Sequence, residues 1–291
     1  MPRTPKPSTS KPSTAKPSTA KPRALKKAAS RGRPTLAERA DRYTLYQKAV
    51  QAPDPEVKFM QRTYRRLRGR APTSFREDFC GTAHLATHWV KGGAERTAIG
   101  VDISAEPLDW GKEHVLGIAA PSVQRRMRLV QADVLSAEVP RVDVIGAFNY
   151  SYCCFKERSV LLRYFRAAHA GLKKDGLFMC DLFGGTEAIA TQADERQCDG
   201  FRYVWDQAQY NPITHEAMNH IHFRFRDGSS LERAFTYDWR LWSIPEVREL
   251  LLEAGFRSTE VWWDPIDEEH YRKTEVEEQQ ATWLVYLVGV K

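Results

Sequence analysis

Residues 76–83 read Arg-Glu-Asp-Phe-Cys-Gly-Thr-Ala, and after an amphipathic segment the chain continues with Ala98-Ile-Gly-Val-Asp102. This pattern predicts a short strand ending in a Cys-Gly-Thr turn, then a helix, then a second strand that closes on an acid. Such a unit is typical of nucleotide-binding folds, because glycine lets the backbone approach the ligand and the later carboxylate can accept hydrogen bonds from both ribose hydroxyls. The sequence has no G-x-G-x-x-G and no Lys-Ser/Thr phosphate cradle behind the turn. A nucleoside without phosphates therefore fits better than a nucleotide.

This stretch resembles the first motif of the class I S-adenosylmethionine-dependent methyltransferases, which usually reads acid-x-Gly-x-Gly-x-Gly. When that motif is laid on Cys80-Gly81-Thr82, its acid becomes Glu77, and Phe79 and Ala83 stand where the family has glycine. The resemblance covers roughly residues 55–291, because later landmarks fall in the family's order. It implies that the methionine part of the cofactor runs closest to the backbone at the one remaining motif glycine.

Two further strand ends carry polar residues that match the family. Met127–Ala132 reads as a strand ending on Asp133, and the resemblance implies that this acid receives the adenine amino group while the Val134 N–H meets a ring nitrogen. Asp133 could instead cap the following turn. Val142–Phe148 reads as a strand ending in Asn149-Tyr-Ser-Tyr152, and carboxyl ends of such strands line the ligand crevice. An ordinary strand-to-helix loop is the alternative for that segment.

The resemblance implies S-adenosyl-L-methionine as the cofactor and no metal. The residues expected to bind the cofactor are Glu77, Cys80, Gly81, Thr82, Asp102, Ile103, Asp133, Val134 and Asn149. Methyl transfer asks little covalent chemistry of a protein, because the sulfonium already activates the methyl group; positioning, and sometimes a base, is enough. The candidates for a catalytic base are Tyr150, Tyr152, Asp206 and His222.

The second half of the chain predicts the remainder of an α/β sheet. Arg158–Leu172 has a helical apolar stripe, Leu177–Phe183 reads as a strand, and Ser243–Glu246 is a capping box that begins another helix. Phe256–Trp263 and Thr282–Val290 read as two strands with no helical pattern between them, so they should pair antiparallel. The predicted fold is a Rossmann-like, doubly wound sheet of seven strands, mostly parallel, with an antiparallel C-terminal strand.

The segment at about 184–241 exceeds a minimal βα repeat. It predicts an inserted antiparallel platform with strands at Phe201–Ala208, Ala217–Phe225 and Leu231–Tyr237. Similar methyltransferases that act on small molecules roof the substrate pocket with such a platform, which makes Trp205 and Tyr210 candidates for substrate binding. Each could equally be a packing aromatic.

Three parts follow from the composition along the chain. Residues 1–35 form a basic tail rich in Lys, Pro, Ser and Thr that is expected to be disordered. Residues 36–70 predict helices that cover the cofactor site, and residues 71–291 the methyltransferase domain. Residues 1–37 hold ten of the 44 Lys and Arg and none of the 37 Asp and Glu, so residues 38–291 carry a net charge of −3. The tail could be a solubilising arm, a non-specific nucleic-acid-binding arm or an organelle transit peptide.

Composition favours a cytoplasmic enzyme. No run approaches 18 consecutive apolar residues, so no membrane association is expected, and no secretory signal is recognisable. The five cysteines are odd in number and lack zinc-type spacing, which predicts free thiols in a reducing compartment. The oligomeric state does not follow from these features.

The predicted function is methyl transfer from S-adenosylmethionine to an oxygen or nitrogen of a small molecule. The alternatives are an RNA or protein methyltransferase recruited by the tail, and a non-catalytic methyltransferase-like binding protein. Asn149-Tyr-Ser-Tyr152 stands where amino-group methyltransferases of nucleobases or glutamine carry Asn-Pro-Pro-Tyr, but the prolines are missing. Cys153 and Cys154 could suggest a nucleophile for pyrimidine C5 methylation, but the usual preceding proline is absent.

Overall fold

A computed structural model describes residues 33–264 and 271–291. Residues 35–291 form one compact unit, and most of the expected disordered tail, residues 1–35, lies outside the described residues. Within the described residues no helix is both long enough and apolar enough to span a membrane.

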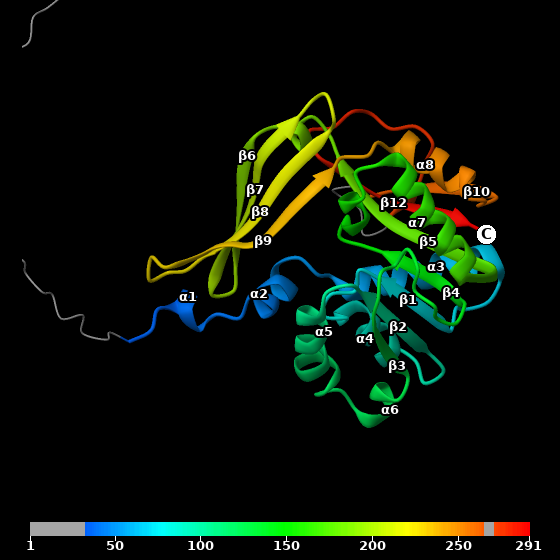
Figure 1. Ribbon diagram of the computed structural model, residues 1–291, viewed down its shortest axis with the longest axis horizontal. Coiled ribbons are helices and arrows are strands. Elements are labelled where there is room, and N and C mark those ends of the chain that lie inside the picture. Colours follow the sequence, from blue (N-terminus) through cyan, green and yellow to red (C-terminus); the bar gives the residue numbers. More distant parts are fainter. Residues whose placement is uncertain (1–32, 265–270) are drawn as a thin grey trace, which may run out of the picture. The chain divides into compact units, whose positions relative to one another are not determined.

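The central sheet confirms the doubly wound prediction (Figure 1). Within the described residues its eight strands lie in the order β11 (Arg272–Lys273), β10 (Ser258–Trp263), β12 (Trp283–Val290), β5 (Leu172–Gly184), β4 (Val142–Ala147), β1 (Ser74–Asp78), β2 (Thr97–Asp102) and β3 (Met127–Gln131). Strands β1 to β5 are mutually parallel, and β12 pairs antiparallel with both β5 and β10. The expected seven strands are present, and the two-residue β11 adds an eighth at the edge.

Alternate side chains of the sheet enter two separate cores, as expected when helices cover both faces. On β4, Val144 joins the core beneath α3 and α4, whereas Ile145 joins the core beneath α7 and α8. The helices around this sheet are α3 (Pro53–Arg68), α4 (His84–Lys91), α5 (Ala105–Gly111), α6 (Pro121–Gln124), α7 (Arg158–Gly171) and α8 (Ile244–Glu253). Short turns of helix occur at η1 (Lys112–Leu116), η2 (Ser151–Cys154) and η3 (Glu187–Ile189).

The central strand β1 is buried although it reads Ser-Phe-Arg-Glu-Asp. Arg76 donates from Nε to Asp78 Oδ1 at 2.6 Å and from a terminal nitrogen to Oδ2 at 3.1 Å, and Tyr164 donates to the same carboxylate at 3.0 Å. A buried charge is tolerated when it is paired and hydrogen-bonded in this way. The pair lies directly before the Cys-Gly-Thr turn and so anchors the end of the strand.

The N-terminal helices begin where the chain supplies caps. Asp41 caps α2 (Arg42–Ala49) by accepting from the Thr44 N–H, which separates α2 from the single turn α1 (Leu36–Arg39). Pro53 and Pro55 occupy the first turn of α3, where a missing N–H is harmless, so they begin this helix as well as ending the segment before it. The capping box at Ser243 is confirmed at the start of α8.

The inserted platform is a separate antiparallel sheet of four strands, β6 (Gln192–Cys198), β7 (Phe201–Asn211), β8 (Glu216–Arg224) and β9 (Ser230–Arg240), within the described residues. Three of them were expected. The first, β6, reads Gln-Ala-Asp-Glu-Arg-Gln-Cys and has no apolar alternation, because it is an edge strand. Apolar residues of α2, including Leu45 and Ala49, pack against the platform residues Ile221 and Phe223.

Candidate cofactor and acceptor sites

The turn after β1 keeps the backbone shape of a glycine-rich loop with a single glycine. The φ angles of Phe79, Gly81 and Ala83 are 57°, 51° and 53°, all in the left-handed region. These are the three positions where the methyltransferase motif has glycine. Side chains at Phe79 and Ala83 cost strain, of the order of 1 kcal/mol each. The two glycine replacements therefore change the residue type and leave the local conformation in place.

Asp102 holds this turn from the end of the neighbouring strand. Its Oδ2 accepts from the Gly81 N–H at 2.8 Å, and its Oδ1 accepts from the Ser104 N–H at 2.9 Å. A carboxylate has about four acceptor positions, so two remain for a ligand. A Cβ built on Gly81 would meet no atom within 4 Å, and this glycine lines a cavity. The backbone here is open to a ligand in contact with it.

Glu77 lies buried beneath the same turn. Its Oε2 accepts from the Ala86 N–H at 2.8 Å, an otherwise unpaired donor in the first turn of α4. Burial, together with the nearby Asp102 and Asp78, raises the pKa of the Glu77 carboxyl to about 8. A cation placed in the adjoining cavity would favour the ionised carboxylate.

The end of β4 is shaped by a carboxylate on β5. Asn149 and Tyr150 both have positive φ, 56° and 57°, and their N–H groups donate to the two oxygens of Asp181, each at 2.8 Å. Burial raises the pKa of Asp181 to about 7 even though these two hydrogen bonds favour its ionised form. Asp181 thus holds the backbone of residues 149 and 150 in place.

The first cavity, which we call the cofactor cavity, has a volume of about 440 Å³ and adjoins the Cys-Gly-Thr turn. Helix α2 closes one side of it, where Gln47 donates to the Thr82 hydroxyl at 3.0 Å and Arg42 pairs with Glu106. Gln51 also lines the cavity, and its buried Oε1 has no hydrogen-bond partner among the described residues. Of the helices expected at residues 36–70, α2 lines this cavity, whereas α3 supplies no residue to the lining.

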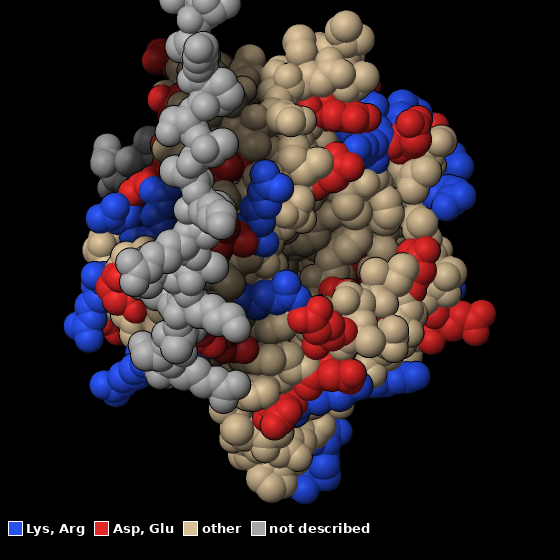
Figure 2. All heavy atoms as spheres, turned by 60° about the vertical axis from the view of Figure 1, so that its left-hand side comes forward, with Lys and Arg blue, Asp and Glu red and all other residues tan. Residues whose placement is uncertain are grey.

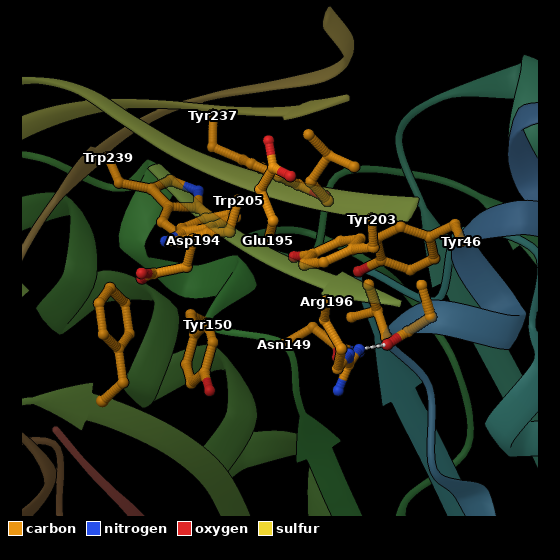
Figure 3. A pocket seen from close by; sticks show the side chains of 14 residues that line it. Tyr46, Asn149, Tyr150, Asp194, Glu195, Arg196, Tyr203, Trp205, Tyr237 and Trp239 are labelled. Atoms are coloured by element: carbon orange, nitrogen blue, oxygen red, sulfur yellow. Dashed lines mark hydrogen bonds between the residues drawn. The ribbon is translucent and has the colours of Figure 1, made fainter. Parts of the chain in front are cut away.

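The second cavity, the acceptor cavity, has a volume of about 420 Å³ and lies between the end of β4, helix α2 and the platform (Figure 3). Aromatic rings make up half of its fourteen lining residues: Tyr46, Tyr150, Phe183, Tyr203, Trp205, Tyr237 and Trp239. The rings touch in sequence, with centroids 4.7 Å apart for Tyr150 and Phe183, and 4.4 Å apart for Tyr237 and Trp239. The space-filling view in Figure 2 shows a hollow with mostly uncharged walls and charged side chains around it.

The two cavities adjoin. Four residues line both, namely Tyr46, Asn149, Tyr237 and Trp239. A ligand group at the boundary would therefore be reachable from either side. This shared wall is the main geometric property of the site.

The expected cofactor residues fall into two groups. Glu77, Cys80, Gly81, Thr82, Asp102 and Asn149 all line the cofactor cavity. Ile103, Asp133 and Val134 do not, although Ile103 follows Asp102 directly and its side chain is 69% exposed. Asp133 accepts from the Leu135 N–H at 2.9 Å, so it caps the following turn, which was the alternative interpretation.

The charge of Asp133 acts on a thiol that lines the cofactor cavity. Burial, and then the charges of Asp133 and Asp102, raise the pKa of the Cys154 thiol to about 11, and Cys154 lines this cavity.

The structure brings only part of the expected acceptor site together. Tyr150 and Trp205 line the acceptor cavity. Tyr152 is fully buried in the core and its hydroxyl donates to the Asp181 carbonyl oxygen at 2.9 Å, so its expected role as a base is not supported. Burial and the nearby Asp181 raise the pKa of Tyr150 well above its usual 10, which keeps its hydroxyl protonated.

The structure does not support Asp206 and His222 as catalytic bases, because side chains alternate between the two faces of a strand. Trp205 and Ile221 point into the cavity, so their neighbours Asp206 and His222 project from the opposite face of the platform. There His222 Nε2 lies 3.3 Å from an Asp206 oxygen. Tyr210 lies near the far end of β7, lines neither cavity and packs beside His215.

The structure opposes two alternatives, an amino-group methyltransferase with an Asn-Pro-Pro-Tyr motif and a pyrimidine C5 methyltransferase with a cysteine nucleophile. A proline could not occupy residue 150, because its ring fixes φ near −65° and Tyr150 has φ 57°. Burial raises the pKa of the Cys153 thiol well above its usual value, as it does for Cys154, so neither thiol is activated as a nucleophile. All five cysteines are free, as expected.

Sequence interpretation missed several residues of the site. Asp181 interrupts the apolar strand Leu-Phe-Met-Cys-Asp-Leu-Phe, and this lone acid was an available signal. Gln47 lies on α2, a helix read mainly for its aromatic residues, and Gln51 lies in the loop that follows it. The charged run Asp194-Glu195-Arg196 reaches the acceptor cavity from β6, the strand that the pattern did not reveal. Within the described residues no cluster of side chains suits a metal ion.

Comparison with known proteins places this fold. No family model matches the chain, and no curated protein matches it. Among solved structures, an S-adenosylmethionine-dependent methyltransferase from Clostridium acetobutylicum ATCC 824 is 18% identical, with 85% of this chain and 96% of that chain covered and a TM-score of 0.63. The sugar N-methyltransferase KedS8 from Streptoalloteichus sp ATCC 53650 is 17% identical, with 87% and 93% covered and a TM-score of 0.59.

A third similar structure is CalS10 with bound S-adenosylmethionine, an amino pentose methyltransferase from Micromonospora echinaspora. It is 11% identical, with 85% of this chain and 95% of that chain covered and a TM-score of 0.61. The chain therefore has the fold of the class I S-adenosylmethionine-dependent methyltransferases, platform included.

Proposed function

We propose that this protein is an S-adenosylmethionine-dependent methyltransferase that acts on a small organic molecule. The observation that carries the proposal is the shared wall of the two cavities. One cavity adjoins a turn and a carboxylate suited to a nucleoside, and the other is lined by aromatic rings suited to an organic acceptor. The similar structures include a sugar N-methyltransferase, an amino pentose methyltransferase and a glycopeptide N-methyltransferase. These names support a small molecule, or a group exposed on the surface of a larger one, as the acceptor of this protein.

The residues present fit the cofactor. The backbone at Gly81 is open to a ligand, and Asp102 has acceptor positions left for the ribose hydroxyls. Ile103 is exposed beside Asp102, where it can contact the adenine ring. The buried Gln51 Oε1 lacks a partner among the described residues, and a ligand donor in the cavity would satisfy it. Bound there, S-adenosylmethionine would supply an activated methyl group.

The chain's own contribution is placement and exclusion of water. Asn149 and Tyr150 are held by Asp181 at the boundary of the cavities, and Tyr46 covers both from α2. The aromatic walls align an acceptor and remove its water, which is most of what methyl transfer requires. The Tyr150 hydroxyl remains protonated, so it orients an acceptor by hydrogen bonding and does not remove its proton.

The test is binding followed by transfer. Full-length protein is titrated with S-adenosylmethionine and S-adenosylhomocysteine by calorimetry, and saturable heat is expected for both. Labelled methyl is then offered with a fractionated cell extract, and label is expected in the small-molecule fraction. Absence of heat and of thermal stabilisation with both compounds would overturn the proposal. Label confined to RNA or protein would overturn the small-molecule acceptor alone.

A further inference from the structure

One charged side chain at the acceptor cavity has no partner among the described residues. Three consecutive residues of β6 reach the cavity. Arg196 donates to the Ala49 carbonyl oxygen and lies 5.4 Å from the centre of the Tyr203 ring. Glu195 pairs with two arginines. The Asp194 carboxylate makes no hydrogen bond and no ion pair with any residue in 33–264 or 271–291, although the residue's backbone belongs to the β6–β7 ladder.

The position of Asp194 directs it into the cavity. It lies opposite Trp205 in the β6–β7 ladder, so the two side chains project from the same face of the platform. Figure 3 shows the Asp194 carboxylate on the side of the Trp205 and Trp239 rings, while the Glu195 carboxylate points away from it. Asp194 is exposed, so water hydrates its carboxylate until a ligand enters the cavity.

Aromatic faces and a carboxylate together select positive charge. The Trp205 and Trp239 rings lie 5.9 Å apart, Trp239 and Tyr150 lie 6.1 Å apart, and Tyr150 and Phe183 lie 4.7 Å apart. Ring faces carry a negative electrostatic potential and attract ammonium groups, most strongly when the site is partly desolvated. A nearby carboxylate adds the same preference. A neutral or anionic ligand gains neither the attraction of the ring faces nor that of the carboxylate.

We propose that the acceptor is an amine, and that Asp194 with the rings of Tyr150, Trp205 and Trp239 holds its ammonium form. This inference rests on the proposed function and names the substrate class of the same site. It goes beyond that function, because methyl transfer to oxygen would be equally compatible with the cofactor cavity.

The charge balance of the reaction agrees with this site. A bound ammonium group first loses one proton to water. The nitrogen lone pair then forms the N–C bond with the methyl carbon while the C–S bond breaks, and sulfur keeps the electron pair. Positive charge passes from sulfur to nitrogen, so the product is again an ammonium. Asp194 and the rings stabilise the charge as it develops in the acceptor cavity.

A hydroxyl acceptor finds less in this cavity. It must lose its proton to a base during the transfer, and the described lining offers no histidine for this, only the carboxylates of Asp194 and of Glu195, which is already paired with two arginines. Asp206 and His222 project from the other face of the platform, and the Tyr150 hydroxyl stays protonated. A product ether would also be neutral, leaving Asp194 unpaired.

The test compares two probes of equal shape in the full-length protein. Choline carries a quaternary ammonium, and 3,3-dimethyl-1-butanol carries an uncharged carbon in its place. Each is titrated with and without saturating S-adenosylhomocysteine, following tryptophan fluorescence, because two tryptophans line the cavity. Choline should bind about tenfold more tightly. Asp194→Asn should remove most of that preference without weakening the neutral probe, and Asp206→Asn, on the other face, should leave it unchanged.

The outcomes separate the two proposals. Equal affinity for the two probes, or equal effects of Asp194→Asn and Asp206→Asn, overturns the amine inference even when S-adenosylhomocysteine binds. A choline preference that depends on Asp194 in a protein that binds no S-adenosylhomocysteine supports the amine site and overturns the methyltransferase. In the transfer assay, labelled small-molecule products should be retained by a cation exchanger in acid; neutral products would contradict the amine.

Discussion

The cofactor cavity and the acceptor cavity share a wall that includes residues of α2 and β9, but the rest of each cavity comes from different parts of the chain. The first is shaped by backbone, namely a turn with three positive φ angles between residues 79 and 83 and two carboxylates within 25 residues of it, Glu77 and Asp102. The second is shaped by side-chain faces from α2, the loop after β4, β5 and four platform strands. Backbone-shaped sites are encoded locally, whereas faces assembled from distant strands depend on the whole fold. The consequences of substitution should differ accordingly.

The largest effect is expected at the backbone. Gly81→Val places a side chain into the cofactor cavity at a φ of 51°, so S-adenosylhomocysteine affinity should fall about 100-fold or more. Gly69→Ala is the matched control, because this glycine also has positive φ, 69°, and open space, but lies at the end of α3 outside both cavities. Calorimetry and thermal unfolding of both variants separate strain from lost binding. Equal affinity in the two variants would contradict the placement of the cofactor.

Asp102→Asn tests the carboxylate of the same cavity. The amide keeps one acceptor for the Gly81 or Ser104 N–H but loses its charge, so cofactor affinity should fall between about 10-fold and 100-fold. Asp109→Asn, an exposed aspartate that pairs with Lys112, should change nothing. Unaltered calorimetric affinity for Asp102→Asn would remove the ribose role.

Two neighbouring tyrosines distinguish the acceptor cavity from the core behind it. Tyr150→Phe should lower the turnover number about tenfold while the affinity for S-adenosylhomocysteine is kept, because Tyr150 lines the acceptor cavity and not the cofactor cavity. Tyr152→Phe should instead lower the free energy of unfolding by about 1–2 kcal/mol, since it loses a buried bond to the Asp181 carbonyl, and should keep its turnover. The reverse pattern would return Tyr152 to the catalytic site.

The Glu77 carboxyl should make cofactor binding depend on pH. Its pKa of about 8 in the free protein falls when a cationic ligand binds, so binding releases a proton below that pH. The affinity for S-adenosylmethionine should therefore rise as the pH approaches 8 from below, by at most about tenfold per unit, and level off above it. Glu77→Gln should flatten this part of the profile, whereas Asp181→Asn should retain it. The cofactor's own titration is common to all variants, so identical profiles would refute the linkage.

The same contrast explains what sequence interpretation could reach. The parallel order of β1 to β5, the antiparallel β12 and the carboxylate at Asp102 depend on apolar runs and short motifs, and the structure confirms them. The roles expected for Asp206 and His222 failed because one residue of register decides which face of a strand a side chain occupies. Strand β6 was not predicted because an edge strand needs no apolar face, and Asp194, which lies on this strand, was missed for the same reason.

The smallest effect should show why a motif can lose its glycines. Ala83 has φ 53°, so Ala83→Gly relieves strain while losing one buried methyl and some chain rigidity, and the free energy of unfolding should stay within about 0.5 kcal/mol of the parent. Ala86, three residues on, is equally buried but helical, and Ala86→Gly should lose about 1 kcal/mol or more. Denaturant unfolding of the two variants measures the difference directly. If Ala83→Gly were as destabilising as Ala86→Gly, the left-handed turn would carry no strain, and the family's preference for glycine there would have to come from contact with the ligand.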